Sequence, residues 1–361
     1  MNVAPSLDVK SEKALQLHIT DTARLFEEAR GRYDVMVNQA AEDEERERAN
    51  LEQPSLDAQR SLPDLLHRDS SSNREVQVKF VSVRSLGGGS YGEVDEVKEL
   101  STGASYARKH IHLDRVRPAN VIAEEVKNEV SIMQKLRHLH IATVLFYLKD
   151  EETYSIFMLP VAEYDLLKFL SRCTEHDCPV ALTKQIYPWF GCLLDALAYA
   201  HKLGIKHQDI KPSNILIKNN QPYLCDFGLA KDFAELDTST SRGLKVQGTL
   251  VYRAPEVIPK QKRGRKADVF SLGCVYSEML TVALGTSLED YRDAREERGS
   301  IAFRYCLPKV VKWLTSFEKK RLSDLLVDEI LSMIAEDAER RHTSEQAVNF
   351  LKQERALFCV E

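Results

Sequence analysis

Hydrophobic and polar residues alternate along two short segments, residues 76–83 and 93–97. This alternation predicts β-strands, because successive side chains of a strand point to opposite faces of a sheet. A continuous apolar run at 156–161 predicts a further strand that is buried on both faces. A helix is expected to begin near Pro118, with Glu129 and Met133 one turn apart on one face.

The first 75 residues have a different pattern. Apolar residues recur every fourth position from Leu25 to Ala41, which predicts a helix over residues 21–50, although Gly31 weakens the pattern. Residues 53–74 are rich in Ser, Asp and Pro and predict a flexible linker. We therefore expect an N-terminal extension at 1–75 and a folded domain at 76–361. The helical pattern is compatible with binding a protein partner, with self-association and with loose docking.

Glycines cluster between the first two predicted strands, in the sequence LGGGSYGEV at 86–94. Glycine lets backbone N–H groups approach phosphate oxygens, because no Cβ lies in the way. The pattern G-x-G-x-x-G also occurs in dinucleotide-binding folds, where a helix follows the glycines. Here a strand pattern follows, which favours a phosphate-binding loop between two strands over a dinucleotide site or a plain hairpin.

Candidate catalytic groups gather in the segment HQDIKPSN at 207–214 and in DFG at 226–228. The first segment supplies a carboxylate at Asp209, an ammonium group at Lys211 and an amide at Asn214, and Asp226 adds a second carboxylate. A carboxylate can accept the proton of a substrate hydroxyl, and hard oxygen ligands suit Mg²⁺. Phosphoryl transfer from a nucleotide needs these groups within a few ångströms of one another.

The order and spacing of these motifs resemble those of the eukaryotic protein kinase family, which carries H-R-D-x-x-x-x-N and D-F-G. The resemblance covers about residues 76–358. It implies an α+β, two-lobed fold: an antiparallel five-stranded N lobe with one main helix (about 76–160) and a mostly helical C lobe (about 161–361). The lysine in D-x-K-P-x-N is typical of serine/threonine kinases, and the hinge and catalytic-loop sequences resemble those of divergent fungal members.

The resemblance implies transfer of the γ-phosphoryl group of MgATP to Ser or Thr hydroxyls of protein substrates. Asp209 is the expected catalytic base, and Lys211 is expected to meet the charge that develops on the γ-phosphate. Asn214 and Asp226 are the expected Mg²⁺ ligands. Met133 is expected to stack with Phe227 and His207 in the column that aligns the two lobes.

Lys109 stands in the place of the V-A-I-K lysine and is expected to hold the α- and β-phosphates. Its expected carboxylate partner is Glu129, twenty residues later, whereas Glu124 and Glu125 are expected to be solvated. The remaining residues expected to contact ATP belong to the glycine loop, the third strand, the hinge and the catalytic-loop strand: Leu86, Gly87, Gly88, Gly89, Ser90, Tyr91, Gly92, Val94, Ala107, Leu159, Pro160, Ala162, Leu216.

Three of these residues have particular roles in the hinge. Leu159 is the expected gatekeeper, with Met158 as the second choice. Pro160 is expected to offer its carbonyl to the adenine amino group, and Ala162 its N–H, because proline has none. Val94, Ala107 and Leu216 are expected to sandwich the adenine ring.

Motifs near the C-terminal end complete the resemblance. The sequence GTLVYRAPE at 248–256 resembles the end of the kinase activation segment. By this resemblance Thr249 hydrogen-bonds Asp209 and Lys211, and Glu256 pairs with Arg341. Asp268 is expected to hold the backbone of the catalytic loop from a buried helix.

Composition narrows the setting. The chain of 361 residues carries a formal net charge of −5, and residues 1–75 hold 16 Asp and Glu against 10 Lys and Arg. No broad basic surface for nucleic acid is expected, and no apolar window long enough for a membrane span occurs. Seven cysteines without C-x-x-C or metal-ligand spacing favour a reducing, intracellular setting, cytoplasmic or nuclear.

Alternatives remain at this point. One is a pseudokinase that acts as a signalling scaffold, which would be expected to lack a catalytic residue. Another is a mainly adaptor-like chain that works through residues 1–75.

Gln208 replaces the arginine that holds an activation-segment phosphate in many family members. We therefore predict that activity depends little on phosphorylation at 233–247. Cys225 is expected to face the ATP pocket, either as an inert small residue or as a target for electrophiles.

Overall fold

The structure is a computed structural model that describes residues 79–89, 92–113, 119–150, 153–176, 178–227, 250–257, 264–318 and 320–359. The chain divides into two units, residues 1–77 and 78–361, and the described residues all belong to the second. The helix and linker predicted at 21–50 and 53–74 lie outside the described residues. The domain boundary at 75/76 therefore stays a prediction.

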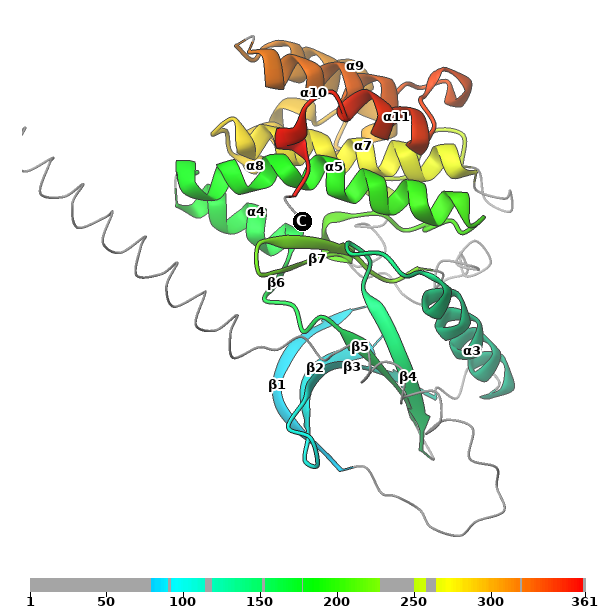
Figure 1. The fold of residues 1–361 in the computed structure, drawn as a ribbon. Coiled ribbons are helices and arrows are strands. Elements are labelled where there is room, and N and C mark those ends of the chain that lie inside the picture. Colours follow the sequence, from blue (N-terminus) through cyan, green and yellow to red (C-terminus); the bar gives the residue numbers. More distant parts are fainter. Residues whose placement is uncertain are drawn as a thin grey trace, which may run out of the picture. The chain divides into compact units, whose positions relative to one another are not determined.

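The N lobe is built on an antiparallel sheet of five strands in the order β1-β2-β3-β5-β4 (Figure 1). The strands are β1 Phe80–Gly89, β2 Gly92–Glu99, β3 Ser105–His112, β4 Thr143–Lys149 and β5 Thr153–Leu159. The predicted end of the first strand at Val83 is wrong. The ladder continues to the pair Gly89 and Gly92, because glycines can extend a hairpin as well as bend it.

Opposite faces of this sheet pack differently. On one face Phe80, Phe146 and Phe157 stack with ring centroids 4.6 Å apart for both Phe80–Phe157 and Phe146–Phe157. The other face packs against helix α3 (Ala119–Lys135), which begins where the sequence predicts a helix. Ile122 and Val126 recur on its buried side at helical spacing.

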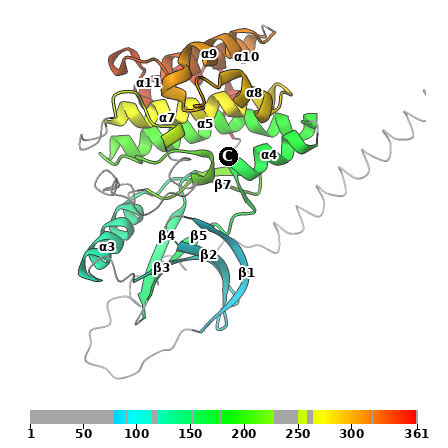
Figure 2. The ribbon, with the colours of Figure 1, turned by 180° about the vertical axis from the view of Figure 1, so that it is seen from behind.

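The C lobe is mainly helical. Its helices are α4 Leu166–Glu175, α5 Val180–Lys202, α7 Arg265–Ala283, α8 Leu288–Arg295, α9 Phe303–Thr315, α10 Arg321–Met333 and α11 Ser344–Leu351. Helix α7 is buried along almost its whole circumference, as expected of a helix at the centre of a core. Figure 2 shows α7 packed beside α5, with α9 and α10 on its far side, and α11 packs against α5.

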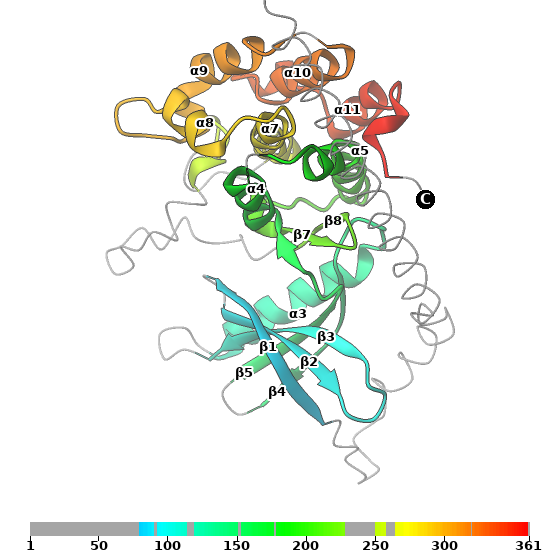
Figure 3. The same cartoon turned by 90° about the vertical axis from the view of Figure 1, so that its left-hand side faces the viewer.

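A small antiparallel sheet, β6 (Tyr164–Asp165), β7 (Ile215–Lys218) and β8 (Gln221–Leu224), lies between the five-stranded sheet and the helices (Figure 3). The loop 203–211 and the short helix η1 (Pro212–Asn214) precede β7, and Asp226 follows β8. Two more single-turn helices, η2 (Ala338–Arg340) and η3 (Arg355–Leu357), flank α11. The α+β, two-lobed architecture predicted from the sequence is confirmed.

Among the described residues, no helix combines the length and apolar character that crossing a bilayer requires.

Candidate active site

Lys109 of β3 lies between two carboxylates. Its Nζ is 2.8 Å from Asp226 Oδ1 and 3.4 Å from Glu129 Oε1. Glu129 faces inward from α3 and is buried with the lysine, whereas Glu124 is exposed and pairs with Lys127. The structure thus brings together Lys109 and the glutamate chosen from the sequence, and adds a direct contact to Asp226 that sequence reasoning did not foresee.

Burial and charge act against each other in this triad. Burial disfavours the charged form of Lys109, but the carboxylates of Asp226 and Glu129 outweigh it and raise the lysine pKa. Burial also works against ionisation of Asp226, yet the adjacent lysine holds the pKa of this carboxyl below its usual range. Burial raises the pKa of Glu129. Asp226 is therefore the carboxylate that carries its charge most readily.

Asp209 is buried at the start of the segment that leads into η1. Lys211 Nζ donates to Asp209 Oδ2 over 2.7 Å, and Asn214 Nδ2 donates to the same oxygen over 3.1 Å and to the Asp209 carbonyl over 2.8 Å. Among the described residues, Asp209 Oδ1 has no hydrogen-bond partner. The loop thus fixes one carboxylate oxygen and leaves the other for a ligand.

The backbone of this loop is held from α7. Asp268 accepts hydrogen bonds from the N–H groups of His207 (2.9 Å) and Gln208 (2.8 Å), and it lies 3.0 Å from His201 Nε2. Gln208 has a φ of 67°, in the left-handed region that non-glycine residues rarely adopt. The positioning that was expected of Asp268 agrees with these contacts.

A cavity of about 770 Å³ lies between the lobes, within the size range of small-molecule and cofactor sites. Of the residues expected to contact ATP or metal, those lining it are Leu86, Gly87, Gly88, Gly92, Val94, Ala107, Lys109, Leu159, Pro160, Ala162, Asn214, Leu216 and Asp226. Gly89 ends β1 beside this loop. Ser90 and Tyr91 lie outside the described residues.

The residues present fit a nucleotide with Mg²⁺. A Cβ built on Gly88 would meet nothing closer than 3.9 Å, so the space above the glycine loop is open for a bulky anion. Lys109 offers the cation, and the side-chain oxygens of Asn214 and Asp226 are hard donors of the kind that Mg²⁺ prefers.

The strand register changes the choice of gatekeeper. Met158 lies directly opposite Ala107 in the β3–β5 pair, and Ile156 lies opposite Lys109, so Met158 shares the pocket face of the sheet. Leu159 alternates to the face of Phe157, which carries the aromatic cluster. Leu159, the first choice from the sequence, lines the cavity from the end of β5, and the register favours Met158, the second choice, as the gatekeeper.

Two neighbours of the metal-binding candidates complete this region. The rings of His207 and Phe227 lie 4.5 Å apart, and Met133 of α3 is buried as expected. Cys225 lines the cavity, but burial raises the pKa of its thiol well above the usual value. A protonated thiol is a poor nucleophile, which supports the inert alternative.

Farther from the cavity, Arg341 donates to both carboxylate oxygens of Glu256, over 2.7 and 2.9 Å, as expected. Thr249 lies outside the described residues. A buried ion pair that was not anticipated, Arg295 with Glu278 at 3.2 Å, lies in the cavity wall itself, and Tyr252 donates to the same glutamate over 2.9 Å. No sequence motif marks this pair, because its members are separated along the chain and joined only by the fold.

Comparison with known proteins bears directly on this site. Residues 80–351 match the protein kinase domain, which is three quarters of the chain. The chain belongs to the eukaryotic protein kinase family and is of the serine/threonine type. The kinase motifs at Lys109, Asp209 and Asp226 all fall within the matched region; Lys109 and Asp226 line the cavity, and Asp209 lies against the lining residue Lys211.

Individual relatives match over different lengths. The cell division control protein 2 homolog 3 of Trypanosoma brucei brucei is 35% identical over 54% of this chain and 60% of its own length. The mitogen-activated protein kinase HOG1 of Alternaria brassicicola is 28% identical over 76% of this chain and 79% of its own. The MAP kinase kinase kinase win1 of Schizosaccharomyces pombe is 29% identical over 60% of this chain and 17% of its own.

Proposed function

We propose that this kinase transfers the γ-phosphoryl group of ATP, with Mg²⁺, to Ser or Thr hydroxyls of protein substrates, and that Asp209 is the catalytic base. The observation that carries the proposal is that the two carboxylate oxygens of Asp209 have different surroundings. One oxygen is occupied by Lys211 and Asn214, and the other has no partner among the described residues. A carboxylate held in this way can orient an incoming hydroxyl and accept its proton.

The cationic groups would neutralise charge during transfer. Bound Mg²⁺ would supply a fixed positive charge that stabilises the phosphate oxygens, and Asn214 and Asp226 are the residues that would hold it. Lys109 would contact the α- and β-phosphates while Glu129 fixes its position. Lys211, 2.7 Å from Asp209, would meet the charge on the transferred group.

The adenine ring would occupy the inner end of the cavity. Val94 and Ala107 from the N lobe and Leu216 from the C lobe would enclose the ring, since all three line this space. Met158 is the proposed gatekeeper, because it shares the sheet face of Ala107 and Lys109.

Retention of the catalytic set argues against the scaffold alternative. A pseudokinase would be expected to lack at least one of Lys109, Glu129, Asp209, Asn214 and Asp226, yet all are present.

We propose an intracellular setting, cytoplasmic or nuclear, and a protein partner for residues 1–75. Removing that extension would test the partner: lost targeting with intact turnover would support an adaptor role beside catalysis.

The direct test is γ-phosphate transfer from MgATP to a mixed Ser/Thr/Tyr peptide library, comparing wild type with Asp209→Asn. Loss of a positioned general base typically costs 10²–10⁴-fold. We expect a fall in that range, with phosphate found on Ser and Thr and with nucleotide binding retained. The control Asp195→Asn, on α5, removes a half-exposed carboxylate that pairs with His138, and it should keep wild-type turnover. Equal turnover in wild type and Asp209→Asn would refute the assignment.

A further inference from the structure

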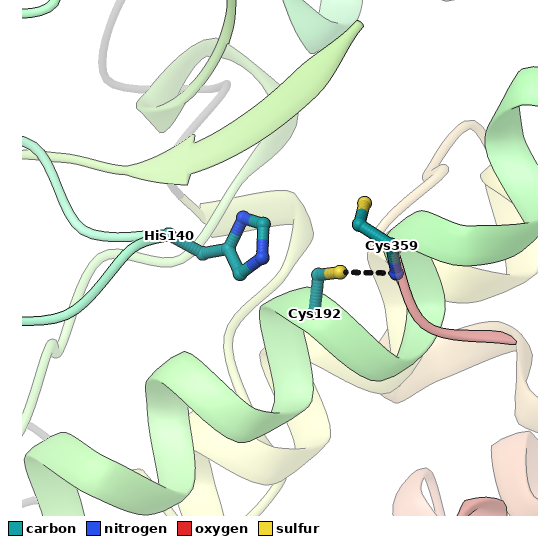
Figure 4. A group of neighbouring side chains, drawn as sticks. All are labelled: His140, Cys192 and Cys359. Carbon is teal, nitrogen blue, oxygen red and sulfur yellow. Dashed lines mark hydrogen bonds between the residues drawn. The ribbon is translucent and has the colours of Figure 1, made fainter. Parts of the chain in front are cut away.

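Three side chains of metal-ligand type meet behind the candidate active site. His140 lies between α3 and β4, Cys192 lies on α5, and Cys359 lies just beyond η3 near the C-terminal end. One ligand atom from each falls within 4.8 Å of the others. Figure 4 shows the His140 ring directed at the two sulfur-bearing side chains. The kinase mechanism uses none of these residues.

The surroundings of His140 fix the form of its ring. Nδ1 lies 3.0 Å from the carbonyl oxygen of Pro222. A carbonyl can only accept a hydrogen bond, so Nδ1 carries the proton and Nε2 keeps its lone pair. In Figure 4 this second nitrogen is on the side of the ring toward Cys192. Metal-binding histidines are commonly oriented in this way, with the other ring nitrogen donating to a carbonyl.

The two cysteines lie beside each other. The backbone N–H of Cys359 donates to Cys192 Sγ over 3.1 Å. Cys192 is buried and Cys359 is half-buried, so neither side chain is fully exposed to solvent. A cysteine binds metal in its thiolate form.

The fold holds the C-terminal segment close to α5. A Cβ on Gly191 would lie 2.3 Å from the Leu357 carbonyl oxygen and 2.6 Å from Phe358 Cδ1. Only glycine permits this approach, which places Cys359 beside Cys192. On the other side, the His140 carbonyl accepts from the Leu224 N–H over 2.9 Å. Both the histidine and the cysteines thus belong to fixed backbone.

We propose that His140 Nε2, Cys192 Sγ and Cys359 Sγ bind one Zn²⁺ ion, with a water molecule as the fourth ligand. Thiolate and imidazole donors favour Zn²⁺ over the hard cations Mg²⁺ and Ca²⁺. Tetrahedral bonds of about 2.3 Å to sulfur and about 2.0 Å to nitrogen place ligand atoms roughly 3.5–3.8 Å apart. The ligand atoms now lie within 4.8 Å of one another, so they would have to approach by up to about 1 Å. Binding releases the remaining thiol protons to solvent and involves no oxidation.

This ion would link three parts of the chain that no covalent bond joins. Leu224, which bonds the His140 backbone, stands two residues before Asp226. The ion would therefore tie the C-terminal segment and α5 to the backbone immediately behind the proposed Mg²⁺ ligand. A disulfide between Cys192 and Cys359 is the competing arrangement. It would not explain why Nε2 of His140 is directed toward Cys192.

Cobalt titration of the full-length protein tests the proposal. The protein is treated with chelator, kept reduced with a phosphine and titrated with Co²⁺, whose visible spectrum reports tetrahedral thiolate coordination. Zn²⁺ is then added in competition, and bound metal is measured by mass spectrometry of the elements. We expect one equivalent of Co²⁺ with thiolate bands, displaced by one equivalent of Zn²⁺.

Ligand variants and matched controls decide the site. His140→Gln and Cys359→Ser should each weaken metal binding at least tenfold. The controls His112→Gln, on β3, and Cys178→Ser, a buried cysteine elsewhere, should bind as wild type does. Circular dichroism and thermal melting confirm that each variant is folded.

Three outcomes would overturn the inference: no tetrahedral thiolate spectrum in the reduced wild type, metal binding that is unchanged in folded Cys359→Ser, or binding lost equally in the controls. The disulfide arrangement would instead show a mass loss of two hydrogens without reductant and no metal uptake with it. None of these results depends on kinase activity, so failure here and failure of the proposed function are distinguishable.

Discussion

Asp268→Asn isolates the support of the catalytic loop from its chemistry. Asp268 is 2% exposed and contacts neither the cavity nor Asp209. Its two oxygens accept from the backbone N–H groups of His207 and Gln208. The amide of asparagine keeps one oxygen, so one of these N–H groups would face an NH₂ donor in the variant.

The expected loss of stability follows from this count. A hydrogen bond to a charged group contributes about 1.5–3 kcal/mol, and a buried donor left without a partner costs about 1–3 kcal/mol. We expect Asp268→Asn to lower the free energy of unfolding by about 2–4 kcal/mol. For a domain of this size, that corresponds to a fall in melting temperature of about 5–15 °C.

Catalysis should fall further than stability explains. A misplacement of about 1 Å at a catalytic group can cost on the order of 10²-fold. Because Asp209 follows Gln208 directly, we expect kcat to drop on that order while KM for ATP changes little. The measurements are thermal melting and steady-state transfer, taken well below the melting temperature of the variant.

A matched variant separates these effects. Glu329→Gln alters another buried carboxylate, on α10 and away from the catalytic loop. Glu329 pairs with His342 over 3.0 Å. The variant should lose stability and keep its kcat. If Asp268→Asn retains wild-type kcat while folded, the idea that Asp268 positions the catalytic loop is wrong.

Three further perturbations test other contacts. Arg341→Ala should cost about 1–3 kcal/mol, since it removes a buried guanidinium that donates to Glu256 and to the Ala335 and Glu336 carbonyl oxygens. A urea-unfolding double-mutant cycle with Glu256→Ala should show coupling, and additive losses would contradict it. Burial lowers the pKa of His207, so below about pH 6.5 the unfolded chain binds a proton more readily than the folded one. The free energy of unfolding should therefore rise with pH from about 5 to 7. An identical pH dependence of stability in His207→Phe would argue against this. Gly191→Ala should destabilise the domain by about 1–3 kcal/mol, because its Cβ would collide with Leu357 and Phe358, and should speed alkylation of Cys359. An unchanged melting temperature would show that the C-terminal segment can move aside at no cost.

The kinase core was predictable from sequence because its chemistry is local. Asp209, Lys211 and Asn214 lie within six residues, so their spacing alone brings them together. Lys109 and Glu129 are farther apart, but a strand followed by an inward-facing helix leaves few other ways to pair them.

At the hinge, chain distance and strand register favour different gatekeepers. Distance from Asp165 favours Leu159, whereas the pairing register, which sets the face of a strand residue, favours Met158. A shift of one residue moves a side chain to the opposite face of the sheet. Register depends on the neighbouring strand, which the count did not include.

The cluster of His140, Cys192 and Cys359 was beyond sequence reasoning for a different reason. Its two cysteines are 167 residues apart, far beyond the short spacings that mark metal ligands in a sequence. The contact between Lys109 and Asp226 is similar, with 117 residues between them. Such groups meet only through tertiary packing.

The hydrogen bonds around His201 set a limit on how far this domain can be shortened. His201 lies 3.0 Å from Asp268 Oδ2 through one ring nitrogen and 2.9 Å from Ser344 Oγ through the other. Three successive contacts, through His201 and Asp268, therefore join Ser344 at the start of α11 to the backbone of the catalytic loop. A recombinant fragment that stops before Ser344 would keep every catalytic side chain and lose part of the support that aligns them. Boundaries for expression or crystallisation belong after this helix, whatever the position of the last recognisable motif.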